Sequence, residues 1–182
     1  MLKITLIVLA VLAFGIVGIL AYAATRPDDF RLQRSAVIKA PPEKIFPFIN
    51  DFKQWGAWSP YEKLDPGMKR IYGATTAGKG ATYAWEGNGN VGSGSMEILN
   101  APAPSQVAIK LDFMRPFEAH NVAEFTLMPS GDGTTVTWAM HGPVPYKFKI
   151  VHLFMNMDKM VGGDFEKGLS ALKSVAETAA RK

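Results

Sequence analysis

The chain has 182 residues, of which 20 are Lys or Arg and 16 are Asp or Glu, giving a formal net charge of +4. It contains no cysteine, which excludes disulfide bonds, thiolate metal sites and a cysteine nucleophile. The Lys and Arg residues form no dense block, so we expect no nucleic-acid partner. A mildly basic surface also suits anionic lipid headgroups.

The N-terminal segment, residues 1–26, is predicted to be a transmembrane anchor or a signal segment. Residues 4–24 carry no charge and as a helix would span about 30 Å, the thickness of a bilayer core. Ala21-Tyr22-Ala23 fits a signal-peptide cleavage site, so cleavage stays an alternative. The apolar cores of signal peptides run to about 7–15 residues, and the greater length here favours a retained single-pass anchor.

The orientation of this anchor rests on two opposing signals. A hydrophobic segment at the start of the chain is typical of a signal anchor, which places the domain outside the cytoplasm. However, Arg26, Arg31, Arg34 and Lys39 follow the segment, and the positive-inside rule places such residues in the cytoplasm. We give the first signal more weight and expect an extracytoplasmic domain.

A strand and two short helices are predicted next. Residues 30–38 alternate as a strand does. Ala40-Pro41-Pro42-Glu43 begins a helix that ends near Ile49, because proline suits the first helical turn and glutamate there favours the helix dipole. Residues 52–58 form a second short helix, which Ser59-Pro60 ends.

The middle of the chain is predicted to be an antiparallel meander. Short alternating segments follow one another, separated by turns rich in glycine, proline and asparagine. They comprise residues 68–72, 81–86, 92–100, 107–113, 121–128 and 134–140.

A long helix is predicted from Tyr146 to Ala180. Its apolar residues recur every three or four positions, as on one helix face, at Ile150, Phe154, Met157, Val161, Phe165, Leu169, Leu172 and Val175. Gly162-Gly163 interrupts this run, so the helix bends there or residues 146–159 form a separate helix. The whole pattern predicts an α+β fold, in which a curved antiparallel sheet of about six to seven strands surrounds the C-terminal helix.

Several segments, in this order, resemble the SRPBCC superfamily, the START-like, polyketide cyclase/dehydrase-like helix-grip proteins. They are Ile38–Phe46, Asn50-Asp51-Phe52 with Trp55 and Trp58-Ser59-Pro60, Gly80–Trp85, Gly92-Ser93-Gly94, Thr134–Trp138, and Asp164–Leu169 with Leu172-Lys173. The resemblance covers about Phe30 to Val175 and implies one such domain over residues 30–180. This fold serves lipid carriers, hormone receptors, cyclases and chaperone-activating modules, so the resemblance transfers no catalytic motif.

The expected function is binding of a lipid or other hydrophobic small molecule in a cavity between the sheet and the C-terminal helix. Such cavities are mostly apolar, and methionine adapts to varied ligands. The candidate lining residues are Trp85, Met96, Phe113, Phe125, Trp138, Met140, Phe154 and Met155, for which ordinary core packing is the alternative. The alternative functions are a cyclase/dehydrase-like enzyme and a chaperone-activator-like protein-interaction module.

Candidate chemistry is sparse, so we expect a binding protein rather than an enzyme. Asp158, on the flank of the helical stripe, is a weak candidate for a buried general acid or base, with a solvated or ion-paired acid as the alternative. His120, His141 and His152 have no metal-ligand spacing, so we expect no metal and no cofactor. The sequence does not indicate an oligomeric state.

Overall fold

The computed structural model describes residues 2–153 and 157–181, which fall into two compact units. One unit comprises the chain up to Phe30 with Pro143–Met157, and the other comprises Arg31–Gly142 with Asp158–Lys182. The helices and strands are α1 (Leu2–Ala24), β1 (Asp29–Ile38), α2 (Pro42–Asn50), the 3-10 helix η1 (Phe52–Ala57), α3 (Tyr61–Leu64), β2 (Lys69–Tyr72), β3 (Thr82–Glu86), β4 (Ser93–Asn100), β5 (Gln106–Arg115), β6 (Ala119–Ser130), β7 (Gly133–Pro143), α4 (Tyr146–His152) and α5 (Met157–Ala180).

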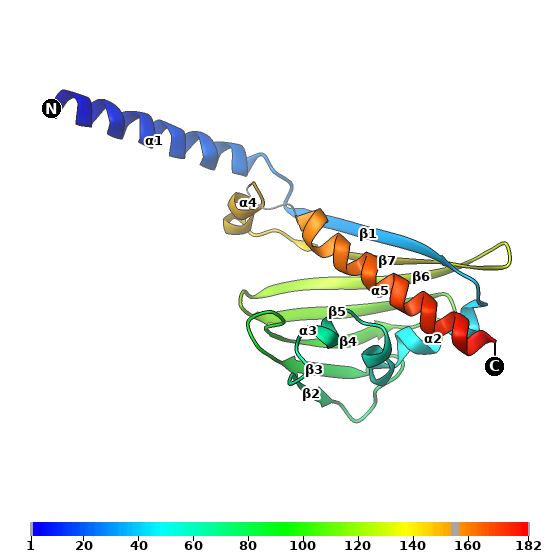
Figure 1. Cartoon of the computed structure of the whole chain (residues 1–182). Coiled ribbons are helices and arrows are strands. Elements are labelled where there is room, and N and C mark those ends of the chain that lie inside the picture. The colour runs from blue at the N-terminus through cyan, green and yellow to red at the C-terminus, as the bar shows by residue number, and fades with distance from the viewer. Residues whose placement is uncertain (1, 154–156, 182) are drawn as a thin grey trace. The chain divides into compact units, whose positions relative to one another are not determined.

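The larger unit is built on one curved sheet. Among the described residues the sheet has seven strands in the order β1-β7-β6-β5-β4-β3-β2 (Figure 1). Strands β2 to β7 pair in succession as antiparallel neighbours. The first strand, β1, lies beside the last, β7, at one edge of the sheet. The predicted α+β helix-grip fold is confirmed.

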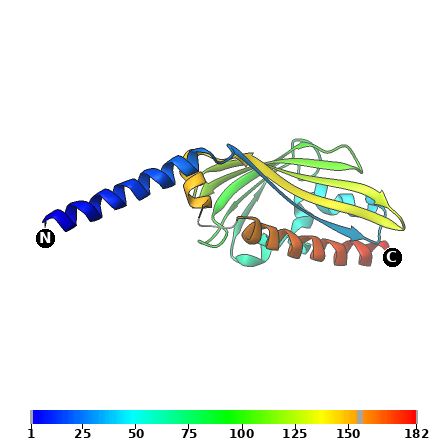
Figure 2. The same cartoon turned by 90° about the horizontal axis from the view of Figure 1, so that it is seen from above.

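Helix α5 lies along one face of this sheet, which we call the inner face (Figure 2). Phe165, Leu169, Leu172 and Ala176 are buried, and their spacing of three or four residues places them on one side of α5. Burial of a Leu or Phe side chain contributes about 1.5–3 kcal/mol, so this stripe attaches the helix to the sheet.

The predicted single helix from Tyr146 to Ala180 is divided in the structure. Helix α4 ends at His152 and α5 begins at Met157, as in the alternative with a separate first helix. Gly162-Gly163 lies inside α5 and does not mark its start. A Cβ at Gly162 would lie 2.2 Å from the guanidinium of Arg34, so the glycine permits the close approach of that side chain.

Two further glycines of α5 give a matched pair of stability predictions. A Cβ at Gly163 would meet nothing within 4 Å, whereas a Cβ at Gly168 would lie 2.7 Å from the Trp138 ring and 3.0 Å from Pro60. Gly163→Ala is therefore expected to raise the free energy of unfolding by about 1 kcal/mol through helix propensity alone. Gly168→Ala is expected to lower it, because the methyl group must displace a buried ring. Urea unfolding of both variants measures the difference, and an equal gain in both would contradict this packing.

Two short helices follow α2 on the inner face. Asp51 caps η1 by accepting a hydrogen bond from the backbone N–H of Lys53 at 3.0 Å. The indole N–H groups of Trp55 and Trp58 donate to the carbonyls of Ile49 and Phe48 at 3.0 and 2.8 Å. Both tryptophans thus anchor η1 to α2. Helix α3 was not predicted from the sequence.

The smaller unit contains α1, which is long and apolar enough to cross a membrane over Lys3–Ala24. Its mean hydropathy in the most apolar window is 2.9, and it lies near the N-terminus, as signal sequences also do. Its exposed large apolar side chains range from Leu20 at 38% to Phe14 at 82%.

Candidate apolar ligand site

One end of the inner face is filled by an aromatic cluster, which consists of the buried residues Trp55, Trp58, Phe125, Trp138 and Phe165. The Trp138 and Phe165 rings are stacked, with centroids 4.0 Å apart and planes inclined by 8°. Trp58 meets Phe125 and Trp138 edge-on at 5.9 and 5.6 Å. Each such pair contributes about 0.5–1.5 kcal/mol beyond its buried area, so this end is packed core.

The other end of the inner face is less covered. Along β5, the inward-facing side chains of Val107 and Ile109 are fully buried, whereas those of Leu111 and Phe113 are only partly buried. Inward-facing apolar groups in the middle of a sheet are normally covered. We call this region the accessible end. It consists of the partly exposed Leu111 and Phe113 and of the buried residues beside them, Trp85, Met96 and Asn121, and the strand register places the five in two adjacent rows.

The accessible end is shaped by an aromatic row. Trp85 lies edge-on to Phe113 at 5.8 Å and is stacked with Tyr83 at 6.2 Å. Gly94 pairs with both Trp85 and Phe113 across the strands, and a Cβ there would lie 2.5 Å from the Trp85 ring. Gly94 therefore makes room for the indole. The Trp85 indole N–H donates to the carbonyl of Val91 at 3.1 Å, so the ring presents its apolar surface inward.

A buried carboxylate lies beside this row. Glu62 of α3 accepts a hydrogen bond from the Tyr83 hydroxyl at 2.6 Å and pairs with the Arg70 guanidinium at 2.6 Å. Burial, together with the hydrogen bond to Glu62, raises the pKa of Tyr83 well above its usual range, so its hydroxyl stays a donor. Each oxygen of Glu62 thus has its own donor, and the pair holds α3 against β2 and β3.

The predicted lining residues are divided between the two ends. Trp85, Met96 and Phe113 belong to the accessible end, whereas Phe125 and Trp138 belong to the aromatic cluster. Met140 is buried on β7 opposite Ala123, between these regions. Phe154 and Met155 lie outside the described residues.

Sequence reasoning missed Leu111, Asn121, Glu62 and Tyr83 as neighbours of the site. The alternation of β5 and β6 already placed Leu111 and Asn121 inward, and that signal was sufficient to find them. For Glu62 there was no signal, because its position depends on α3.

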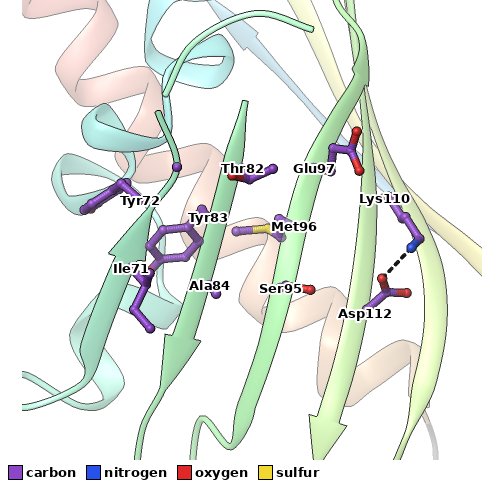
Figure 3. Close-up of a pocket in the computed structure, with 11 residues that line it drawn as sticks. Ile71, Tyr72, Thr82, Tyr83, Ala84, Ser95, Met96, Glu97, Lys110 and Asp112 are labelled. Carbon is purple, nitrogen blue, oxygen red and sulfur yellow. Dashed lines mark ion pairs between the residues drawn. The ribbon is translucent and has the colours of Figure 1, made fainter. Parts of the chain in front are cut away.

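A separate shallow groove of about 230 Å³ lies mainly on the outer face of the sheet, over β2 to β5. Figure 3 shows its lining, with Lys110 and Asp112 at one side. Asp112 accepts from Lys110 and from His120 at 2.8 Å each, and these contacts lower its pKa. Its charged rim on β5 makes this groove less suited to an apolar ligand than the inner face.

Asp158, the weak acid/base candidate, lies at the surface. Its side chain is 64% exposed, and the Arg34 guanidinium donates to its two oxygens at 3.0 and 2.9 Å. Arg34 also donates to Glu166 at 2.7 Å. The hydrogen bond from Arg34 lowers the pKa of Asp158, which favours a structural ion pair over proton transfer.

The lowered pKa of Asp158 predicts a pH dependence. Because its folded pKa lies below the ordinary value of 3.8, the pair stabilises the fold above that value and loses its effect as the pH falls through the folded pKa. We expect Asp158→Asn to lower the urea midpoint at pH 6 and to differ less from wild type at pH 3. A difference between the two chains that grows on acidification would contradict this.

The described histidines and acids are scattered over the structure. In residues 2–153 and 157–181, no group of three or more His, Asp or Glu side chains is placed to hold a metal ion. His120 is exposed and paired with Asp112, and His141 lies 3.7 Å from Glu124. The His152 side chain is outside the described part.

Comparison with known proteins gives one family and many structures of the same fold. A family model described as "Polyketide cyclase / dehydrase and lipid transport" matches residues 29–177. A search of curated proteins finds no match.

Three solved structures illustrate the likeness. Protein SA2116 of unknown function from Staphylococcus aureus is 16% identical, with a TM-score of 0.61 over 85% of this chain and 97% of that chain. Protein MLL2253 from Mesorhizobium loti is 16% identical, with a TM-score of 0.59 over 82% and 98%. The Aha1 dimer from Colwellia psychrerythraea is 15% identical, with a TM-score of 0.54 over 83% and 96%. At such identities the likeness establishes the fold alone.

Proposed function

Because the chain belongs to the polyketide cyclase/dehydrase and lipid transport family, we propose that its helix-grip domain binds a lipid or other hydrophobic small molecule at the accessible end. The observation that carries the proposal is the difference in burial along β5. Val107 and Ile109 are fully buried, whereas Leu111 and Phe113 are only partly buried. Apolar surface left partly open on an inner face gains free energy when a ligand covers it.

The chemistry of the accessible end supports this class of ligand. Leu111 and Phe113 offer partly exposed apolar surface, and the buried Trp85 and Met96 beside them add an aromatic ring and a flexible apolar side chain, with the Asn121 amide in the same row as Leu111. A mostly apolar surface with few polar groups is typical of small-molecule sites.

Binding rather than catalysis is the proposal, because Glu62, the buried carboxylate beside the aromatic row, is already engaged. Glu62 receives the Tyr83 hydroxyl on one oxygen and Arg70 on the other. A general acid or base needs a free position toward its substrate.

The proposal includes retention of the domain at a membrane through residues 4–24. The length and hydropathy of α1 support it, since 22 residues at about 1.5 Å each cross a bilayer core.

Extraction of the purified full chain tests the ligand. Organic solvent is expected to release a lipid or other apolar molecule, identified by mass spectrometry. Lipids around residues 4–24 are also released, so the control is Leu111→Trp, which keeps that segment and fills the accessible end. We expect this variant to lose one molecular species and retain the others. Identical species in equal amounts from both chains would contradict the proposal.

A further inference from the structure

Helix α4 is fastened to the end of α1 by polar contacts within the smaller unit. The Tyr146 hydroxyl donates to the carbonyl of Leu20 at 2.7 Å. The ammonium of Lys149 donates to the carbonyl of Arg26 and pairs with Asp28, both at 2.7 Å. These contacts fix both the start and the middle of α4 against residues 20–28.

The burial of Lys149 indicates that the contact between α4 and residues 20–28 is a specific structural one. Its side chain is only 6% exposed, and a buried ammonium is costly unless its donors are satisfied. A backbone hydrogen bond of 2.7 Å from Val144 to the carbonyl of Asp28 adds a third tie just before α4.

This attachment sets the depth of α4 if α1 spans a bilayer. Residues 4–24 fill the hydrocarbon core, so Leu20 to Arg26 lie where the core meets the headgroups. Tyrosine and tryptophan favour that boundary, and Lys and Arg next to it favour anionic headgroups. The exposed side chains near this boundary fit these preferences. They are Tyr22 at 55%, Tyr146 at 45%, Val151 at 42% and Lys147.

We propose that α4, together with the last turn of α1, docks on the headgroup–acyl boundary of the membrane that α1 spans. The inference rests on the proposed anchor. The occupant is lipid rather than a protein, because Tyr146 and Lys149 hold α4 at the depth of Leu20 to Arg26.

Spin labels in the full chain test this docking. The chain has no cysteine, so single cysteines can be placed at Val151, at Val11 in α1 and at Met128, which is 65% exposed on β6. The chains are reconstituted in vesicles of phosphatidylcholine and phosphatidylglycerol. Accessibility to oxygen, which enters the acyl region, is compared with accessibility to a water-soluble nickel complex.

We expect the label at position 151 to favour oxygen over nickel several-fold more than the label at 128. Lys149→Ala should increase nickel access at position 151, whereas Lys79→Ala, which removes an exposed lysine of the larger unit, should not. If the label at position 11 is shielded from nickel but 151 behaves as 128 does, docking is wrong and the anchor stands. If the label at position 11 is accessible to nickel, both the docking of α4 and the membrane anchor are wrong.

Discussion

Phe165→Ala is expected to lower the free energy of unfolding by about 3–5 kcal/mol. Phe165 is 2% exposed, and its ring stacks on Trp138 at 4.0 Å. Truncation removes both the buried area and the stack, and it leaves a cavity beside the Trp138 ring. Urea unfolding of the full chain in mild detergent measures the change.

Met128→Ala serves as the matched control for this truncation. Met128 is 65% exposed on β6, and surface changes of this kind usually stay within about 0.5 kcal/mol. Phe165→Leu should fall between the two, because it keeps apolar volume but loses the stack. A loss below about 1 kcal/mol for Phe165→Ala would contradict a packed aromatic cluster.

Phe113→Asp is expected to reduce occupancy by the apolar ligand at least about tenfold, which corresponds to about 1.4 kcal/mol. A carboxylate at the accessible end must lose water without a partner when the ligand covers it, and that cost exceeds 1.4 kcal/mol. The amount of ligand that remains with the purified chain, measured by native mass spectrometry, gives the ratio.

The neighbouring residue provides the control for charge. Met114 follows Phe113 on β5, has no partner on β4 because the register shifts there, and is 62% exposed. Met114→Asp is expected to leave occupancy unchanged, with the same net charge as Phe113→Asp. Equal losses in both variants would attribute the effect to charge or folding and not to the inner face.

Much of the fold was predictable because it depends on local pattern. The alternation of Val107, Ile109, Leu111 and Phe113 predicted both the strand and its inward side, and the register confirms it. The stripe of Phe165, Leu169 and Leu172 likewise predicted the face of α5.

The candidate site was less predictable because it depends on long-range contacts. Trp85 and Trp138 both face inward, and no local signal shows that Trp138 packs in a filled cluster while Trp85 borders partly open surface. That difference arises from which ring each meets, Phe165 in one case and Phe113 in the other. Helix α3, which has four residues, leaves too short a periodic signal to predict, and Glu62 was missed with it.

Quenching of Trp85 tests the central claim, that an apolar ligand lies at the accessible end, most directly. All four tryptophans lie in the larger unit, with three in the aromatic cluster and Trp85 at the accessible end. A brominated fatty acid is expected to quench part of the wild-type fluorescence, and Trp85→Phe should abolish that part while Trp138 and its neighbours still emit. Quenching that is equally strong without Trp85 would place the ligand elsewhere and contradict the account.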